Sequence, residues 1–313
     1  MIVASIDIGS NTVLLLIAKL ELDSQPFLIP IANYYRIPRI SKEIDANGII
    51  QDAAVNRLID VLREYAIIIK NHKCEKVVVT GTFALRIAAN SSAILQKVKE
   101  LFGWDVIIIS GDEEAKLSFL GAAFPFQNDK FINVIDIGGG STEIICGNRE
   151  KILYKKSFNI GVVTLTEKFI DKYTLKLDYY LMEEYVKNFL KLDSLKVFKS
   201  SAKTLAVAGT PTTLSAIKQN LRVHIESKIE GSTLTINDII SIVETLKDLT
   251  PKEIKNKFGE VVNGREDVLL TGAIILKSSM NLLRIQKIYV STRGLRYGTI
   301  IKYFLGIDVT KVG

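Results

Sequence analysis

Short apolar runs that end at glycine alternate along this chain with longer segments in which apolar residues recur at helical spacing. Spacings of three and four predict an amphipathic helix through these positions: Val55, Leu58, Ile59, Leu62, Tyr65, Ala66 and Ile69. The run Lys76–Thr80 is short, rich in valine and followed by glycine, which is typical of a buried strand. Strands and helices of this kind predict an α/β fold.

The same patterns continue over the rest of the chain. Further strands are predicted at 27–37, 105–109, 151–158, 204–208 and 287–291. Helices are predicted at 91–102, 111–125, 162–173 and 178–199, from 235 onward, in an apolar segment that ends near 283, and at the carboxyl end. The sequence has no low-complexity linker, so we expect packed segments to join the domains.

One segment, Val134–Glu143, combines an apolar run, two carboxylates and three consecutive glycines. Asp136 stands near the end of the run, and Glu143 follows seven residues later. Carboxylate oxygens suit Mg²⁺, while glycines let a backbone approach an anion closely and form a phosphate-binding concavity with their N–H groups. The residues expected to hold the anion are Gly138, Gly139, Gly140 and Ser141.

The residues after Glu143 distinguish between kinds of phosphate site. Ile144–Gly147 is short and apolar, so it predicts a second strand and hence a hairpin. A dinucleotide-binding fold requires a helix at this point, and a P-loop requires Gly-Lys-Ser/Thr, which does not follow. An ordinary hairpin turn is the alternative, although it needs only one or two glycines and no flanking carboxylates.

The amino terminus repeats this arrangement 129 residues earlier. A strand ends in Ile6-Asp7-Ile8-Gly9, the small polar residues Ser10, Asn11 and Thr12 follow, and a second apolar run begins at Val13. A motif repeated at domain-sized spacing predicts two similar α/β halves, each of which offers an Asp-Gly turn to one cleft. Two facing turns would grip one phosphate chain from both sides.

Three further candidates lie where predicted strands end. Arg86 follows the strand at 76–80, near the edge where open α/β sheets bind ligands, with an ordinary surface arginine as an equal alternative. Glu114 follows two acidic residues, whose place at the start of a helix is explained by the helix dipole. Glu114 lies further into the helix, so it is a candidate to face the cleft. Thr210 begins a helix with Pro211 near its start, which suits an anion at a helix N-terminus.

Composition limits the class of protein. The 313 residues are 48% hydrophobic and 24% charged, enough for two domains with sizeable cores. No apolar run reaches the ~18 residues of a membrane span, and the amino terminus lacks a signal peptide's basic region, so we expect a cytoplasmic protein without a membrane partner. Cys74 and Cys146 lack metal or redox spacing and are expected to be buried thiols. His72 and His224 stand alone, which argues against a histidine site.

The net charge of +7 is unevenly distributed along the chain. Residues 1–118 hold 13 basic and 14 acidic side chains, whereas residues 119–313 hold 28 and 20. The basic excess of the later part would attract a polyanion, although lysine-rich surfaces are common. No aromatic-interleaved basic motif or zinc-finger spacing indicates specific nucleic-acid binding.

With these segments together, the chain resembles the exopolyphosphatase/guanosine pentaphosphate phosphatase (Ppx/GppA) family, within the superfamily of actin, sugar kinases and heat-shock chaperones. The resemblance covers nearly the whole chain. The segments that carry it are 6–12, 82–86, 110–115, 134–143, 208–214, 265–267 and 294–298. The run Asp-Ile-Gly-Gly-Gly-Ser-Thr-Glu, with Gly-Asp-Glu-Glu-Ala upstream, is specific to the family, whereas the two Asp-Gly turns indicate only the superfamily.

The resemblance implies an α/β fold of two ribonuclease-H-like (actin-like ATPase) domains with a cleft between them. We expect the first domain to span 1–118 together with 299–313, and the second to span 119–298. A final helix that starts near 299 is expected to pack back on the first domain. Longer members of the family add a helical region at the carboxyl end, so any processivity that it gives is expected to be reduced here.

The resemblance also implies removal of a terminal phosphate from polyphosphate or guanosine pentaphosphate with Mg²⁺, or Mn²⁺ in its place. By position, Glu114 matches the catalytic base, and Asp136 and Glu143 match the metal and catalytic carboxylates, with Asp7 nearby. Arg86 and Arg265 match the phosphate-binding arginines. The other residues expected to bind phosphate are Gly9, Ser10, Asn11, Thr12, Thr210 and the glycine turn at 138–141.

Two alternative functions stay open. A kinase of the same superfamily would share the Asp-Gly turns but would need an acceptor to release phosphate from the donor. An alarmone-binding regulatory protein with weak activity would suit the basic second half, although a pure polyanion binder gains nothing from three carboxylates in its site. The sequence leaves open the preferred substrate, the chain-length preference, whether the chain forms a homodimer, and the effect of Tyr297, where the family often has glutamate.

Overall fold

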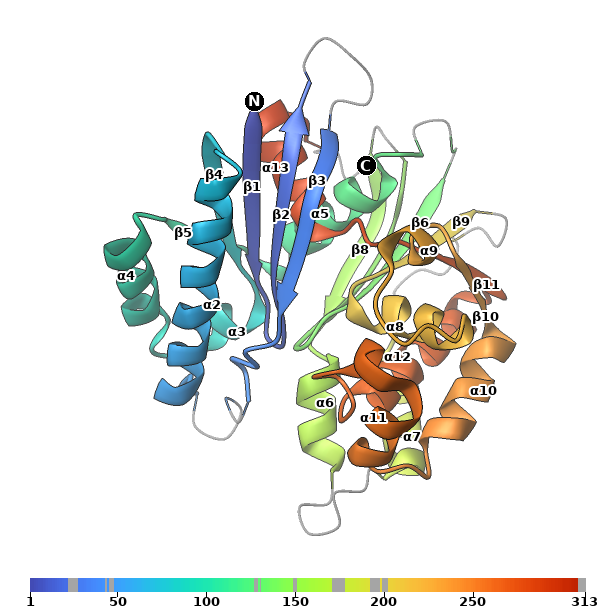
Figure 1. The fold of residues 1–313 in the computed structure, drawn as a ribbon. Coiled ribbons are helices and arrows are strands. Elements are labelled where there is room, and N and C mark those ends of the chain that lie inside the picture. Colours follow the sequence, from blue (N-terminus) through green and yellow to red (C-terminus); the bar gives the residue numbers. More distant parts are fainter. Residues whose placement is uncertain are drawn as a thin grey trace. The chain divides into compact units, whose positions relative to one another are not determined.

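The computed structural model describes residues 1–21, 28–42, 44, 48–126, 129, 131–148, 151–170, 178–191, 198 and 202–308. These residues form two compact units, each with its own β-sheet (Figure 1). Unit 1 comprises Met1–Gly121 and Leu295–Asp308, and unit 2 comprises Ala122–Gly294. Residue 27 of a predicted strand, residues 171–173, 192–197 and 199 of predicted helices, and residues 309–313 of the predicted first domain lie outside the described residues.

Within the described residues, unit 1 has a five-stranded sheet in the order β3-β2-β1-β4-β5. The strands are β1 (Ile2–Ile8), β2 (Val13–Leu20), β3 (Leu28–Arg36), β4 (Lys76–Gly81) and β5 (Val106–Ile108). β1, β2 and β3 are antiparallel neighbours, whereas β4 and β5 run parallel to β1. Pro30 is tolerated because β3 lies at the edge of the sheet, where the register against β2 also shifts.

Four helices of unit 1 precede its last helix: α2 (Asp52–Asn71), α3 (Phe83–Ile87), α4 (Ser91–Phe102) and α5 (Gly111–Ala123). Helices α2 and α4 pack against the sheet and form the core of unit 1 with it. Ile6 and Ile8 of β1 belong to the same buried cluster as Leu58 of α2 and Val98 of α4. Gly103 ends α4 in a left-handed conformation, which glycine adopts without steric cost.

The last helix, α13 (Leu295–Leu305), contacts β1, β2 and β4. It begins at Leu295 rather than near 299, because Leu295 is itself buried against Ile109 and Leu117. Gly298 permits a close crossing with α5, since a Cβ there would lie 1.8 Å from the backbone oxygen of Leu117. The helix is therefore packed into unit 1 from its first turn.

Tyr297 anchors this helix to the sheet of unit 1. Its side chain is buried, and its hydroxyl accepts a hydrogen bond from the side-chain amide of Asn33 at 3.5 Å. The neighbouring Arg296 donates to the side-chain oxygen of the same Asn33 at 3.0 Å and to the backbone oxygen of Leu15 at 3.3 Å. The tyrosine thus has a packing role that a charged glutamate could not fill at the same depth.

The described part of unit 2 has a six-stranded sheet in the order β10-β11-β9-β6-β7-β8. The strands are β6 (Ile132–Ile137), β7 (Thr142–Gly147), β8 (Ile152–Phe158), β9 (Lys203–Val207), β10 (Thr233–Thr235) and β11 (Lys287–Val290). β6, β7 and β8 are antiparallel neighbours, and β9 and β11 run parallel to β6.

The two sheets share one topology. In each unit a hairpin is extended on one side by a third antiparallel strand and on the other side by two parallel strands. Unit 1 reads β3-β2-β1-β4-β5, and unit 2 reads β8-β7-β6-β9-β11 with β10 added at the edge. The repeat that links Asp7 and Asp136 in the sequence therefore reflects two halves of the same architecture.

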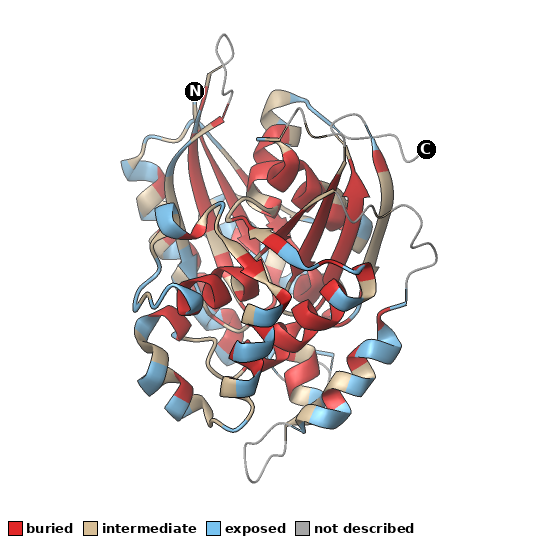
Figure 2. Cartoon of the chain, turned by 90° about the vertical axis from the view of Figure 1, so that its right-hand side faces the viewer, coloured by how far each residue is buried: buried red, intermediate tan, exposed pale blue. Residues whose placement is uncertain are grey.

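The helices of unit 2 surround a long buried one. They are α6 (Val162–Phe169), α7 (Tyr179–Phe189), α8 (Gly209–Lys218), α9 (Glu226–Ile229), α10 (Ile236–Leu246), α11 (Pro251–Phe258), a 3₁₀ turn at Gly259–Val262, and α12 (Leu269–Leu283). Most residues of α12 are buried, and it contacts α6, α7, α8, α10 and β6. Figure 2 shows buried positions along the strands and exposed positions on the outward sides of helices.

Some features differ from what the sequence suggested. α9, β10 and α11 were not predicted. The side chain of Asn90, the residue before α4, does not cap that helix and instead exchanges two hydrogen bonds with the backbone of Ile50. Cys146 is buried as expected, whereas Cys74 is only partly buried. Among the described helices, none has both the length and the apolar character needed to cross a membrane.

An ion pair inside unit 2 joins α7 to α12. The ammonium group of Lys277, largely buried on α12, donates to Glu183 and to the hydroxyl of Tyr179, each at 2.9 Å. Burial by itself would raise the pKa of Glu183, but hydrogen bonds from Lys277, Tyr179 and Lys187 outweigh it and lower that pKa from 4.5 to about 2. The charged carboxylate is thus favoured in the folded state.

Glu183→Gln is expected to lower the thermal unfolding midpoint at pH 7. The free energy of unfolding should fall by about 1–2 kcal/mol, a value between those of exposed and buried ion pairs. Because folding lowers the pKa of Glu183, its contribution is complete above pH 4.5 and disappears as the pH falls toward 2. The gap in midpoint between wild type and variant should therefore shrink between pH 7 and pH 3. Glu184→Gln, at an exposed neighbour, is the matched control, and a gap that does not change with pH would contradict the assignment.

Candidate functional site

The β6–β7 hairpin brings two of the predicted carboxylates together. Asp136 and Glu143 stand directly opposite each other in the antiparallel register, so their side chains extend from the same face of the sheet. Both are buried, with 9% and 1% of their surface exposed. Opposed residues of this kind have Cβ atoms about 5 Å apart. One cation can therefore contact both carboxylates.

The glycine turn between these strands is held by the start of α6. The turn closes with a hydrogen bond from the Gly138 N–H to the Ser141 oxygen at 2.9 Å. The N–H groups of Val162 and Val163 donate to the carbonyl oxygens of Gly138 and Gly139 at 3.0 and 2.8 Å. These carbonyls are therefore engaged by the helix, which fixes the peptide planes of the turn.

The opposite side of the turn offers donors. Within the described parts of the chain, no hydrogen bond uses the backbone N–H of Gly139 or Gly140. Successive N–H groups with their carbonyls turned to other partners form the kind of concavity that binds anions. The prediction that this turn can hold a phosphate therefore has a geometric basis.

Gly161 makes the contact between turn and helix possible. A Cβ at this position would lie 2.3 Å from the carbonyl carbon and oxygen of Gly139 and 2.4 Å from the nitrogen of Gly140. All three are backbone atoms, which cannot rotate away as a side chain can. The sequence reading missed Gly161, and the only signal for it is a glycine placed just before a predicted helix.

The amino-terminal turn in unit 1 repeats the construction. The Gly9 N–H donates to the Thr12 oxygen at 3.0 Å, as Gly138 does to Ser141. The N–H groups of Arg39 and Ser41 donate to the carbonyls of Asn11 and Ser10, each at 3.1 Å. In both units the segment that binds the turn's carbonyls follows the third strand of the sheet. Asp7, with 8% of its surface exposed, precedes the turn and is paired in register with Leu14 and Thr80.

Two serine hydroxyls flank the unit 1 turn. Ser10 and Ser41 are 3% and 1% exposed, and the Oγ atoms of both are buried without a hydrogen-bond partner among the described residues. Buried hydroxyls normally have a hydrogen-bond partner. A buried hydroxyl without one, beside a turn of this kind, is consistent with a ligand that would provide the hydrogen bond. Ser10 was predicted from the sequence, whereas Ser41 was missed because it lies 31 positions further on.

Arg86 and Glu114 form an ion pair in unit 1. The guanidinium Nη1 of Arg86 lies 3.2 Å from Glu114 Oε2 and also donates to the Ile109 oxygen at 2.7 Å. Glu114 is 8% exposed on the first turn of α5, and Arg86 is partly buried on α3. The arginine predicted to bind phosphate is therefore also the group that orients the predicted base.

The start of α8 in unit 2 carries Thr210 and lies beside Arg265. The guanidinium of Arg265 lies over Gly209, where a Cβ would come 1.8 Å from its Nη1, and this nitrogen donates to Thr213 Oγ1 at 3.4 Å. The Thr210 hydroxyl lies against α12, 2.3 Å from where a Cβ of Gly272 would be. This side chain is therefore engaged in helix packing, which makes the backbone N–H of Thr210 the better candidate for an anion.

Ala208, just before α8, has a strained backbone. Its φ of 75° and ψ of −168° belong to a region that glycine alone adopts readily. Such a conformation costs about 1–3 kcal/mol and persists only where the surrounding structure enforces it. Here it turns the chain sharply from β9 into the helix whose first turn lies under Arg265.

The donor set of the hairpin fits a Mg²⁺ ion. Proteins bind Mg²⁺ through one or two carboxylates, and water and phosphate oxygens complete the octahedron. Asp136 and Glu143 supply two such carboxylates. Over the described part of the chain, no group of three histidine, cysteine, aspartate or glutamate side chains is arranged to hold a metal. A Mg²⁺ site completed by the substrate therefore fits these residues better than a closed protein cage.

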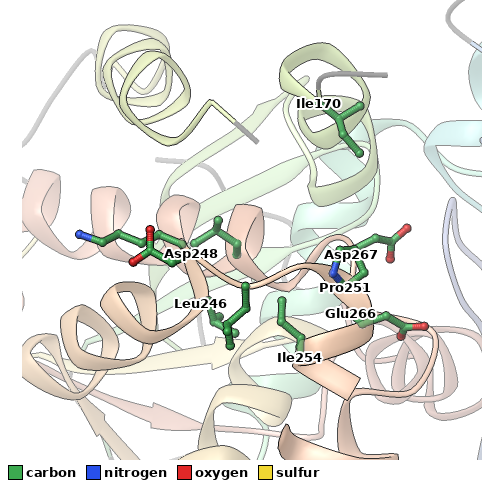
Figure 3. Close-up of a pocket in the computed structure, with 10 residues that line it drawn as sticks. Ile170, Leu246, Asp248, Pro251, Ile254, Glu266 and Asp267 are labelled. Atoms are coloured by element: carbon green, nitrogen blue, oxygen red, sulfur yellow. The ribbon is translucent and has the colours of Figure 1, made fainter. Parts of the chain in front are cut away.

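A cavity of about 200 Å³ lies in unit 2 but is not made of the predicted site residues (Figure 3). Its lining is apolar apart from Lys247 and three carboxylates, those of Asp248, Glu266 and Asp267. A phosphate would be repelled by three carboxylates. The cavity is thus a poor candidate for the anion site, even though Glu266 and Asp267 follow Arg265 directly.

Known proteins resemble this chain over most of its length. The sequence profile of the Ppx/GppA phosphatase family matches residues 20–305. The bifunctional 3-dehydroquinate synthase/phosphatase of Fusobacterium nucleatum is 33% identical over 315 residues, which cover 96% of this chain and 46% of that protein. Exopolyphosphatase 2 of Mycobacterium tuberculosis is 31% identical over 293 residues, 90% of this chain and 91% of that protein. The chain thus spans about half of the first relative and most of the second.

Solved structures give the same result for the fold. A Ppx/GppA family member from Aquifex aeolicus matches with a TM-score of 0.79 and 31% identity over 98% of each chain. An exopolyphosphatase from Cytophaga hutchinsonii matches with a TM-score of 0.85 and 26% identity over 99% of this chain and all of that one. These similarities confirm the predicted two-domain, actin-like α/β fold.

Proposed function

Because the chain belongs to the Ppx/GppA phosphatase family, we propose that it hydrolyses the terminal phosphoanhydride of inorganic polyphosphate, of guanosine pentaphosphate, or of both, with Mg²⁺ as the cation. One observation carries the proposal. Each unit contains an Asp-Gly turn whose carbonyls are bound by a following segment, beside a buried aspartate. Relatives named exopolyphosphatase match this chain over 90% or more of its length, which supports polyphosphate as the substrate class.

In this proposal the glycine turns bind phosphate oxygens, and the arginines hold the same anion. The backbone N–H groups at 10–11 and 139–140 would donate to phosphate oxygens, as an anion concavity does. Arg265 would add a planar pair of charged donors at the start of α8, a position that favours anions. Because the proposal gives each turn a part in phosphate binding, a substitution in either turn should reduce turnover.

Asp136 and Glu143 would hold the Mg²⁺, with Asp7 as a predicted further contributor from unit 1. When bound, the cation neutralises charge on the transferred phosphoryl group and the leaving oxygen. The chain's own part is to hold two buried carboxylates opposite each other on neighbouring strands.

Glu114 would orient the attacking water and accept its proton. The carboxylate is held in place by Arg86, which approaches Oε2 at 3.2 Å and is itself fixed by the oxygen of Ile109. Base and arginine are therefore one assembly on α5 and α3. We propose that Arg86 serves both functions, as the clamp for Glu114 and as a phosphate ligand.

The decisive test is phosphate release from the purified chain with Mg²⁺. Long polyphosphate, short polyphosphate and guanosine pentaphosphate would be compared, with and without a chelator. We expect chelator-sensitive release from at least one of them without any acceptor. Release that needs an added acceptor would indicate a kinase, and tight alarmone binding without release from any substrate would indicate a regulatory protein.

Asp136→Asn is expected to raise the Mg²⁺ concentration for half-maximal phosphate release by at least ~10-fold, since even partners of metal ligands cost that much when removed. The neutral amide keeps the size of the side chain but weakens its attraction to a cation. A Mg²⁺ titration of phosphate release measures the effect. Asp129→Asn is the matched control, because it makes the same change at a carboxylate that pairs with Lys203. An unchanged Mg²⁺ requirement would remove Asp136 from the metal site.

A further inference from the structure

We propose that Ser157 is a positioning residue that orients Glu143 for the metal ion, an inference that rests on the proposed function. Ser157 lies on β8 directly opposite Glu143. Its hydroxyl donates a hydrogen bond of 2.6 Å to Glu143 Oε1. This distance is in the range of charge-assisted O–H···O⁻ bonds, which are about twice as strong as neutral ones.

Three strands contribute one polar row to the sheet of unit 2. Asp136 on β6 opposes Glu143 on β7, and Glu143 opposes Ser157 on β8. Directly opposed residues of antiparallel strands point to the same face. The row therefore runs from one candidate metal carboxylate through the other to the serine.

Burial explains why the carboxylate needs this partner. Glu143 is 1% exposed, and a buried carboxylate without a hydrogen-bond donor is strongly unfavourable. Glutamate also has more side-chain torsions than aspartate, so its carboxylate must be fixed by a contact if it is to meet a cation at one place. A donor to Oε1 fixes the plane of the carboxylate and hence the direction of its oxygens.

The neighbouring hydroxyl of Thr142 serves the backbone instead. Thr142, next to Glu143, donates to the oxygen of Ile160 at 2.7 Å. Such bonds stabilise local structure and touch no candidate ligand. Ser157 differs because its acceptor is the carboxylate itself. Its effect should therefore appear in metal binding.

Direct metal binding tests the proposal without hydrolysis. The affinity of the purified chain for Mn²⁺, a spectroscopic substitute for Mg²⁺, would be measured by electron paramagnetic resonance in the absence of substrate. Ser157→Ala is expected to weaken Mn²⁺ binding by ~10-fold, the lower end of the effect of removing a partner of a metal ligand. The Mg²⁺ requirement for phosphate release should rise by a similar factor.

Two further variants separate the hydroxyl from the packing of the side chain. Threonine and valine have the same shape and both suit a strand. Ser157→Thr should bind Mn²⁺ as the wild type does, whereas Ser157→Val should lose as much affinity as Ser157→Ala. Ser232→Ala is the control, because it removes a side-chain hydrogen bond of the same 2.6 Å length, to Ser215, elsewhere in unit 2.

The outcomes are distinguishable. Equal Mn²⁺ affinity of the threonine and valine variants would overturn the proposal, as would a wild type that binds no Mn²⁺. Weaker Mn²⁺ binding by Ser157→Val in a chain that releases phosphate from none of the three substrates would support the positioning role and refute the proposed function. If Ser157→Ala does not fold, the threonine–valine comparison still decides.

Discussion

Gly161→Ala should slow phosphate release by at least ~10²-fold, because a misplacement of about 1 Å at a reacting group is enough to cause such a loss. The new methyl group would lie 2.3 Å from the carbonyl carbon and oxygen of Gly139, far inside van der Waals contact. Because the three nearest atoms all belong to the backbone, the strain can be relieved only by moving the turn or the start of α6. Either movement breaks the bonds from Val162 and Val163 that hold the turn's carbonyls.

The measurement is the rate of phosphate release and its KM, together with the thermal unfolding midpoint. We expect a large loss of turnover and weaker substrate binding in a chain that still folds, since the clash concerns one loop. Gly294→Ala is the matched control in the same unit, where a Cβ would meet only the side chain of Val207 at an ordinary 3.7 Å. A Gly161→Ala variant with wild-type turnover would show that the turn does not bind the substrate.

Glu114→Gln should also reduce turnover by ~10²-fold or more, the usual contribution of a positioned base. Glutamine keeps an oxygen that can accept the hydrogen bond from Arg86 at the same place, so the local structure should survive. It cannot accept a proton from water. Substrate affinity is therefore expected to stay near that of the wild type while the rate constant falls.

Single-turnover phosphate release and equilibrium binding of polyphosphate would separate these two quantities. Glu113→Gln is the control, since the neighbouring carboxylate on α5 pairs with Lys302 and Lys116 rather than with Arg86. Near-normal release by Glu114→Gln would refute its role as base. Loss of binding and rate together would instead show that the Arg86–Glu114 pair shapes the phosphate site.

Local patterns were enough to predict the hairpins and the glycine turns. An apolar run, a glycine and a second apolar run specify strand, turn and strand without reference to distant residues, and both hairpins occur as predicted. The start of α10 and the end of α4 also followed from local signals, a capping threonine and a glycine. The short elements β10 and α9 did not, because β10 is defined by its pairing with β11 and α9 has only 4 residues. α11 was missed although its start carries local signals, a capping box of Thr250 and Glu253 with Pro251 between them.

The supports of the site could not be predicted, because they come from distant segments. Ser157 is 14 positions from Glu143, and nothing in its own neighbourhood marks it as a partner of a carboxylate. The pairing of Arg86 with Glu114 spans 28 positions and depends on how β4 and β5 are aligned. A sequence pattern identifies groups able to do chemistry, whereas the contacts that hold them are set by strand register.

The way α6 binds the glycine turn has a thermodynamic consequence. Three consecutive glycines have more backbone freedom to lose than any other tripeptide, and a loose loop would surrender that freedom each time it bound an anion. Here the hydrogen bonds from Val162 and Val163 have already ordered the turn when the chain folds. Capture of a phosphate then requires little further loss of conformational entropy, so each turnover begins from a preorganised turn.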